Sequence, residues 1–251
     1  MPKLLDFDRL SVVLVSTRNP LNIGAVARAM SNLGFSSLRV VNPFAASFRE
    51  ARSAVGAAPL LKRAEEFTSV ADAVADCSLV VGTTAAQNRE LQQPLKDLQQ
   101  AAPLIRKRIG TSRVALLFGS EKRGLSNDDL SYCHWLLHIP TRAEHRSMNL
   151  GQAAAVCLYE LARSGRDRGG DKSSQIPEPA KNEAANAAEL ERMTKLLMEA
   201  LQASGYLKPQ AAAAKEEKVR RMIRRLGLTA DGAEMWQGML RQIVWKLNRD
   251  R

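Results

Sequence analysis

The chain has 251 residues, of which 45% are hydrophobic and 25% are charged. This composition excludes a mainly disordered, collagen-like or disulfide-stapled protein. The 37 lysines and arginines exceed the 26 acidic residues and leave a net charge of +11, which favours a polyanionic partner, nucleic acid more often than a membrane surface. Three cysteines without metal-ligand spacing, no signal peptide and no long apolar run predict a cytoplasmic protein that does not enter a membrane.

The first 163 residues alternate short apolar runs with helical patterns. Runs typical of buried strands cover residues 10–16, 38–41, 79–81, 114–118 and 135–139. Apolar spacing typical of helices covers residues 23–33, 70–76, 95–108, 128–133 and 149–163. Strands that alternate with helices predict an α/β domain with a mostly parallel sheet flanked by helices. In such sheets ligands bind beyond the carboxyl ends of the strands, so the loops there are candidate sites.

The rest of the chain differs in composition. Residues 164–182 are rich in Gly, Ser, Pro and charge and predict a flexible linker. Residues 183–251 show helical spacing around 190–201, 215–228 and 235–247. We therefore expect a domain in residues 1–163 and a small all-α C-terminal extension in residues 183–251, which packs against itself or against a partner.

The loop after the first predicted strand is the first candidate for chemistry. Asn22, near the predicted N-cap, and Gly24, in the first helical turn, expose backbone N–H groups that suit an anion. Arg28 lies in the early turns of the same helix. Taken alone, this segment is better explained as an ordinary capped helix with a surface arginine.

Two further loops follow predicted strands. Gly119 and Gly124 flank Glu121 after residues 114–118, and glycines let the backbone approach a ligand closely. After residues 135–139, Ser147 and Asn149 stand at the entrance of a helix rich in small residues, where either one also serves as a simple helix cap.

The conjunction of these loops is more specific than each loop alone. Asn-x-Gly-x-x-x-Arg, Phe-Gly-x-Glu-x-x-Gly-Leu and Ile-Pro…Ser-x-Asn-Leu, in this order and at these separations, resemble the motifs of the SPOUT-class RNA 2′-O-methyltransferases. Within that class the chain resembles the TrmH superfamily and its TrmJ type, over about residues 9–163. The resemblance implies a C-terminal trefoil knot, an S-adenosyl-L-methionine site in the knot, no metal, and a homodimer with composite active sites.

The resemblance also implies roles for individual residues. Positions that match the family's catalytic residues are Arg28, Asn22, Glu121, Ser147 and Asn149. Positions that match its cofactor-binding residues are Thr83, Thr84, Ala85, Gly119, Glu121, Gly124, Ile139, Arg146, Ser147 and Met148. One departure from the family is visible in the loop that follows the predicted strand at residues 79–81. The family often carries Ala-Arg directly after a Gly-Thr-Ser in this loop. Here the arginine comes later, as Arg89, which leaves its RNA-contacting role open.

Arg28 is the residue that we expect to carry the chemistry. An arginine with a pKa above ~12 is a poor base. We therefore expect Arg28 to hold the 2′-oxygen and the adjacent phosphate and to stabilise developing alkoxide charge. A phosphate or water would accept the proton, and Asn22 and Glu121 would orient Arg28 or the nucleotide.

RNA contact should come from basic groups outside the pocket. A dense cluster in residues 218–225 predicts phosphate contacts from Arg220, Arg221, Arg224 and Arg225, the alternative being a solvated helix face. The cluster at residues 106–108 is a weaker candidate. Cys77, Cys133 and Cys157 lie outside the three motifs, so a cysteine nucleophile of the kind used for base methylation is not expected.

These features predict S-adenosylmethionine-dependent 2′-O-ribose methylation of tRNA, at the pyrimidine nucleotide in the first position of the anticodon loop. The C-terminal extension would serve RNA binding, dimerisation or both. One alternative is an rRNA 2′-O-ribose methyltransferase, because the motifs mark the chemistry more securely than the target. Another is a catalytically inactive RNA-binding module, which the intact motif residues argue against. A dinucleotide-dependent oxidoreductase ranks last, because no Gly-x-Gly-x-x-Gly follows the first strand.

Overall fold

A computed structural model describes residues 7–44, 58–85, 91–142, 144–145, 147–163, 183–208 and 212–249. The predicted linker at residues 164–182, the candidate cofactor residue Arg146 and the displaced Arg89 lie outside the described residues.

The described residues of the first unit form one parallel sheet in the strand order β3-β2-β1-β6-β4-β7-β5. Strands β1 (Leu10–Val15), β2 (Ser37–Val41), β4 (Leu79–Thr83), β6 (Val114–Phe118) and β7 (Trp135–His138) confirm the five predicted strands. The sequence pattern missed β3 (Glu65–Phe67) and β5 (Leu95–Asp97), since each is a three-residue edge strand without a buried apolar run. The predicted α/β class is confirmed.

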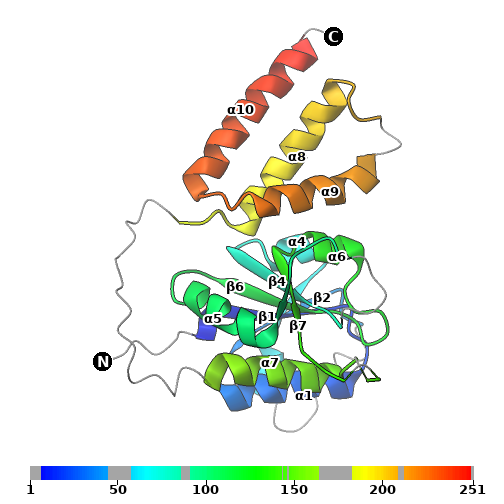
Figure 1. The fold of residues 1–251 in the computed structure, drawn as a ribbon, viewed down its shortest axis with the longest axis vertical. Helices are drawn as coiled ribbons and strands as arrows, with labels where there is room; N and C mark the ends of the chain where they lie inside the picture. The colour runs from blue at the N-terminus through cyan, green and yellow to red at the C-terminus, as the bar shows by residue number, and fades with distance from the viewer. Residues whose placement is uncertain are drawn as a thin grey trace.

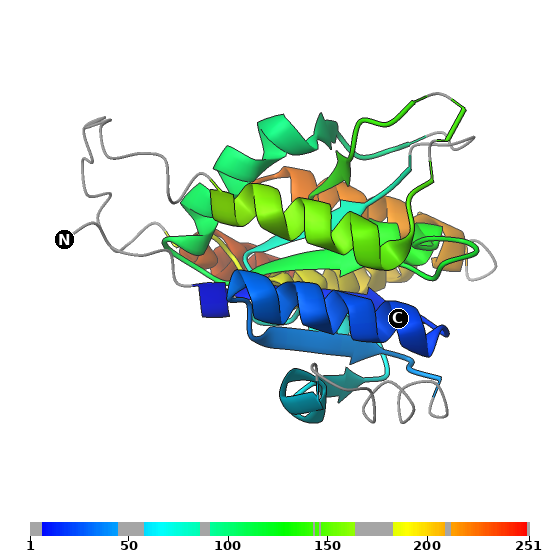
Figure 2. The ribbon, with the colours of Figure 1, turned by 90° about the horizontal axis from the view of Figure 1, so that it is seen from below.

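Helices cover both faces of this sheet (Figure 1). Helices α1 (Pro20–Leu33) and α7 (Leu150–Arg163) lie side by side on one face (Figure 2), where α3 (Ala58–Lys62) and α5 (Leu98–Ile109) pack into the same core. The short helices α4 (Val70–Ala73) and α6 (Asn127–Ser131) lie on the opposite face. A short 3-10 turn (Phe7–Arg9) precedes β1. Helix α5 begins later than predicted because β5 takes its expected first residues.

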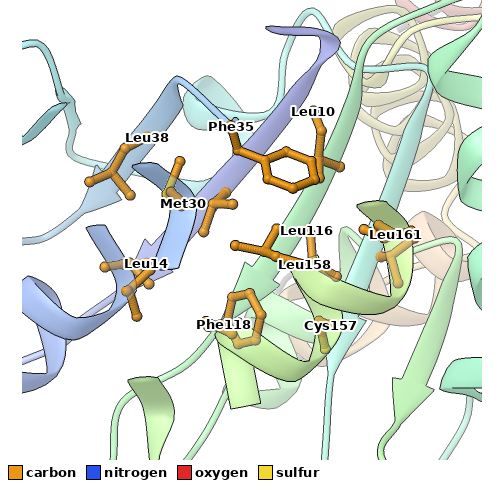
Figure 3. Packing of buried hydrophobic residues seen from close by; sticks show 14 of the residues in the cluster. Leu10, Leu14, Met30, Phe35, Leu38, Leu116, Phe118, Cys157, Leu158 and Leu161 are labelled. Atoms are coloured by element: carbon orange, nitrogen blue, oxygen red, sulfur yellow. The ribbon is translucent and has the colours of Figure 1, made fainter. Parts of the chain in front are cut away.

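The core consists of two layers separated by the sheet, because neighbouring residues of a strand point to opposite faces. In β1, Leu14 joins the cluster under α1 and α7, whereas Val13 joins the cluster under α4 and α6. Figure 3 shows the first cluster, in which Phe35, Phe118 and Leu158 come from three different parts of the chain. All of these side chains are at most 1% exposed, so the strands read as continuous apolar runs in the sequence.

Three helices, α8 (Ala187–Ala203), α9 (Ala212–Arg225) and α10 (Ala230–Arg249), form the C-terminal helical unit. Their own small core contains Leu190, Met193, Ile223, Ala233 and Leu240. The unit packs on the side of the sheet that carries α4 and α6 (Figure 1). In the described part of the chain, no helix is both long enough and apolar enough to span a bilayer.

A partly buried ion pair ties the segment that follows α4 to the sheet. Arg39 of β2 is 4% exposed and donates to the Asp76 carboxylate at 2.6 and 2.9 Å and to the Ala73 carbonyl at 2.8 Å. The hydrogen bond from Arg39 outweighs burial and lowers the pKa of Asp76 to about 2. A carboxyl whose pKa is lower in the folded chain stabilises the fold above pH ~4 and loses this contribution as pH falls.

We therefore expect Asp76→Asn to lower the free energy of unfolding by about 1–2 kcal/mol at neutral pH, a value reduced for the partial exposure of Asp76. The difference from the wild-type chain should shrink as the pH falls from about 4 towards 2, where the wild-type carboxyl is itself protonated. Urea unfolding at several pH values measures this. Arg113→Gln removes only a surface partner of Asp76 and should cost about 0.5 kcal/mol or less. An equal loss in both variants would contradict this assignment.

Candidate active site

A cavity of about 520 Å³ opens beyond the carboxyl ends of β4, β6 and β7, where parallel sheets bind ligands. Every described candidate for cofactor binding lines it: Thr83, Thr84, Ala85, Gly119, Glu121, Gly124, Ile139, Ser147 and Met148. Of the candidate catalytic residues, Asn22 and Asn149 line it as well. The three loops, which are far apart in the sequence, therefore meet at one place.

The three loops are joined by a chain of side-chain hydrogen bonds. Asn149 donates from Nδ2 to Asn22 Oδ1 at 2.9 Å, and Asn22 donates from Nδ2 to Glu121 Oε1 at 3.1 Å. Asn149 Oδ1 accepts from the N–H of Gly151 at 2.9 Å and thereby caps the start of α7. Gly151 allows this close approach of the two helices, because a Cβ there would lie 2.6 Å from the Ala25 Cβ on α1.

The first loop differs from prediction in one detail. The N-cap of α1 is Asn19 and not Asn22. The sequence signal for this helix start is Pro20, because proline is favoured at the first helical position. Asn22 lies in the first turn, 8% exposed. The predicted anion at this helix start is the chain's own Glu121 carboxylate, which accepts from the N–H groups of Asn19 at 3.2 Å and Arg18 at 3.4 Å.

Glu121 is held as a carboxylate by these donors. Partial burial alone raises the pKa of Glu121, but hydrogen bonds from its own backbone N–H, from Asn22 and from the N–H groups of Asn19 and Arg18 outweigh burial. They hold the pKa of Glu121 below its ordinary value. At neutral pH the group therefore accepts hydrogen bonds and has no proton to give.

The loop that carries Glu121 is a tight turn. The N–H of Gly124 donates to the Ser120 carbonyl at 2.8 Å, and Gly124 adopts a φ of +66°. A Cβ on Gly119 would lie 2.0 Å from the carbonyl carbon of Gly124 and 2.2 Å from the nitrogen of Leu125. Because both contacts are backbone atoms, a side chain at Gly119 requires the loop to move.

Comparison with known proteins agrees with this geometry. The model of the SpoU rRNA Methylase family matches residues 9–159. The chain belongs to the SpoU methylase family. The chain is also 32% identical, over 237 residues, to the tRNA (cytidine/uridine-2'-O-)-methyltransferase TrmJ of Pectobacterium atrosepticum, which covers 94% of this chain and 97% of that protein. The crystal structure of TrmJ from Z. mobilis ZM4 matches with a TM-score of 0.77 and 29% identity, covering 93% of this chain and 98% of the other. The resemblance seen in the three motifs is thus confirmed.

Members of the SpoU family are methyltransferases whose cofactor is S-adenosyl-L-methionine, and the cavity of this chain fits that molecule. Its volume falls within the range of roughly 300–1,000 Å³ that is usual for small-molecule sites. Polar groups at Glu121 and Asn149 face apolar walls from Ile139 and Met148, which suits a ligand with both polar and apolar parts.

Arg28 lies apart from the cavity of its own chain. Of the described catalytic candidates, it alone does not line the cavity, and its side chain is exposed on α1. Arg28 follows Asn22 by six residues, which is about 240° around the helix and roughly 9 Å along it. The side chain that we expected to act in the site therefore points away from Asn22.

The predicted RNA contacts on α9 need correction. Arg220, Arg221 and Arg224 are 4%, 8% and 3% exposed, so they cannot present their charge to phosphates in this structure. Arg221 pairs with Glu217 on its own helix. Arg225 is exposed and donates to the Gln92 carbonyl. Arg220 and Arg224 thus make contacts inside the protein, whereas Lys218 and Arg225 stay exposed, and the RNA contact of Arg225 stays a prediction.

The sequence candidates omit several residues that line the cavity. Ser120, Leu125, Leu130 and Thr141 also line the cavity, and all of these except Leu130 lie within a motif already singled out. All three cysteines are buried, and burial raises the pKa of the Cys77 and Cys157 thiols to about 12. These thiols therefore stay protonated, as expected for core residues. Among the described residues, no group of three or more His, Cys, Asp or Glu side chains is placed to hold a metal ion.

Proposed function

We propose that this chain methylates the ribose 2′-hydroxyl of tRNA, at the pyrimidine nucleotide in the first position of the anticodon loop, in the cytoplasm. The observation that carries the proposal is the extent of the similarity to TrmJ proteins, which spans the helical unit as well as the methyltransferase domain. An rRNA substrate is the alternative suggested by the family name. The full-length TrmJ relatives, which are named for tRNA, favour the first reading.

The site residues supply positioning and charge. When it is bound in the cavity, S-adenosylmethionine supplies an activated methyl group. Glu121 fixes Asn22 and the start of α1, and Asn22 in turn fixes Asn149 at the start of α7. Ser147 and Asn149 line the cavity and would shape the junction between the cofactor and the ribose. Arg28 of a second copy would hold the 2′-oxygen and stabilise its negative charge as the proton leaves for a phosphate or water.

The place of Arg28 supports a homodimer with composite sites. Arg28 points away from the cavity of its own chain. If two copies pack through the face that carries α1 and α7, Arg28 of one copy acts in the cavity of the other. Figure 2 shows α1 and α7 forming the outer layer of one face. Leu21 on α1 and Val156 and Tyr159 on α7 are 79%, 39% and 57% exposed, and large exposed apolar side chains gathered on one face are typical of interfaces. The expected trefoil knot stays a prediction.

The exposed end of α10 is a better RNA surface than α9. Arg241, Trp245 and Arg249 recur every four residues on one exposed face of α10, and Trp245 is 52% exposed. The Arg249 guanidinium lies 5.3 Å from the centre of the Trp245 ring. Residues 239–249 contain no acidic side chain. Unpaired RNA bases stack on aromatic rings and arginine planes, and phosphates bind nearby guanidinium groups.

We expect the double substitution Arg241→Gln and Arg249→Gln to weaken tRNA binding about 10-fold and to reduce the salt slope of binding by about 1–2. Filter binding at several salt concentrations measures both quantities. Lys62→Gln with Arg63→Gln removes the same charge from two exposed positions, the last residue of α3 and the residue that follows it, and serves as the control. Equal weakening by both pairs would mean that net charge alone, and not the α10 surface, governs binding.

The substrate class is tested by offering total tRNA and rRNA separately with radiolabelled S-adenosylmethionine. Label in tRNA supports the proposal. Label confined to rRNA would overturn the choice of substrate. Label in neither, with intact S-adenosylmethionine binding, would favour an inactive RNA-binding module.

A further inference from the structure

The two units meet through a buried ionic cluster centred on Arg220 of α9. Arg220 donates to both carboxylate oxygens of Glu191 on α8, at 3.0 and 3.2 Å. Across the boundary it donates to Asp128 Oδ1 at 3.2 Å and to the Ser131 hydroxyl at 2.8 Å. Its guanidinium also lies 4.2 Å from the centre of the Tyr132 ring. A single arginine thus ties the helical unit to α6 and the residue that follows it.

Helix α6 is part of the cavity wall. Leu125, which precedes α6, and Leu130 within it both line the cavity. The turn from Gly119 to Gly124 leads directly into this segment. A second tie runs in parallel, because the Gln93 side chain donates to the Leu130 carbonyl at 2.6 Å while Arg225 donates to the Gln92 carbonyl. The outer side of this wall is therefore held by the helical unit.

The composition of the cluster indicates a fixed contact. Glu191 has a side chain 11% exposed, and Arg220 is 4% exposed. Loss of Arg220 would leave the buried Glu191 carboxylate with the more distant Arg224 guanidinium, 3.7 Å away, as its ion-pair partner. This loss should therefore weaken the docked arrangement. Asp128, by contrast, is 63% exposed at its side chain and can be changed without leaving a buried charge.

We propose that Arg220 is a positioning residue for S-adenosylmethionine: by holding α6, it keeps the wall of the cofactor cavity in the shape that binds the cofactor. The helical unit then serves cofactor affinity as well as RNA contact. Linkage makes the effect reciprocal, so bound cofactor also stabilises docking of the helical unit. The inference rests on cofactor binding in the cavity and not on which RNA is methylated.

Calorimetric titration of the full chain with S-adenosylmethionine, without RNA, tests the proposal. Arg220→Met keeps the side-chain stem and removes the charge, and should raise the Kd for S-adenosylmethionine about 5- to 50-fold. Arg220→Lys should recover part of the affinity. The control is Arg221→Met, the same change at the next residue, whose ion pair with Glu217 lies within α9. It should leave the Kd within about 2-fold of the wild-type value.

Two further substitutions lie on α6, in the methyltransferase domain, and remain informative if the Arg220→Met protein does not fold. Asp128→Asn and Ser131→Ala each remove a partner of Arg220 on α6, and together they should raise the Kd about 5-fold or more. Hydrogen exchange should show faster exchange in residues 119–131 than in the wild-type chain, with the strands unchanged.

An unchanged Kd in the Asp128→Asn and Ser131→Ala double variant would overturn the proposal. So would an Arg220→Met protein that loses tRNA affinity but keeps wild-type S-adenosylmethionine affinity, because Arg220 would then serve the RNA. Failure of tRNA methylation alone leaves this titration interpretable, since no RNA enters it.

Discussion

Replacement of Arg28 by alanine should lower the methyl-transfer rate by about 10²–10³-fold, the usual effect of removing one group that stabilises transition-state charge. S-adenosylmethionine affinity should stay at the wild-type level, because Arg28 does not line the cavity of its own chain. The fold should also be unaffected, since the side chain is exposed. Arg28→Lys should recover little, because an ammonium group lacks the planar fork that holds two oxygens. Single-turnover methyl transfer to tRNA, with calorimetry alongside, measures both quantities.

Complementation separates a composite site from a site within one chain. Arg28→Ala and Gly119→Ala subunits should each be inactive alone, since one lacks the arginine and the other lacks a working cavity. When the two are co-expressed, a mixed dimer with composite sites holds one complete site, so activity should recover to about one quarter of wild type. A mixture that stays inactive would contradict the composite arrangement. An Arg28→Ala enzyme with wild-type rate would contradict the role of Arg28 itself.

The Gly119→Ala substitution is expected to raise the Kd for S-adenosylmethionine by about 10-fold or more, a loss of about 1.4 kcal/mol, because the turn that lines the cavity must move to admit the new Cβ. The added Cβ would meet backbone atoms of Gly124 and Leu125 at 2.0 and 2.2 Å, and neither can rotate aside. The turn would then open and carry Glu121 away from Asn22. Calorimetry measures the loss of affinity, and the rise in melting temperature on adding cofactor should largely disappear.

Gly238→Ala provides the matched control, because an added Cβ meets nothing within 4 Å on α10. That change should leave cofactor affinity unchanged and stabilise the helix by up to about 1 kcal/mol. A Gly119→Ala protein that binds S-adenosylmethionine normally would show that this turn does not shape the cofactor site.

The sequence predicted the features that depend on local pattern. The central strands were recognised because strands buried on both faces are continuous apolar runs, whereas β3 and β5 are short edge strands that contain charged residues. The three loops were recognised because three spaced motifs resemble one family. The hydrogen bonds that join these loops were not predicted, since the one from Asn149 to Asn22 joins residues 127 positions apart and local pattern carries no signal for it.

The arginines of α9 show why a charge run is ambiguous. Glu216, four residues before Arg220, forms an ion pair with it along the helix, and this spacing is the one signal of a partner within α9. The partners that bury Arg220 are Glu191 on α8 and Asp128 on α6, which are 29 and 92 residues away. Long-range packing of this kind decides whether a basic helix faces solvent or another unit, and the sequence pattern of the helix is the same in both cases.

The central claim is that this chain methylates a ribose 2′-oxygen of tRNA at one position. The most direct measurement incubates unmodified tRNA with the protein and labelled S-adenosylmethionine, and then maps the label by nuclease digestion and mass spectrometry. Our account predicts one 2′-O-methylated pyrimidine nucleotide at the first position of the anticodon loop, absent with Arg28→Ala. A methyl group on a base instead of a ribose, or label in rRNA with none in tRNA, would contradict it.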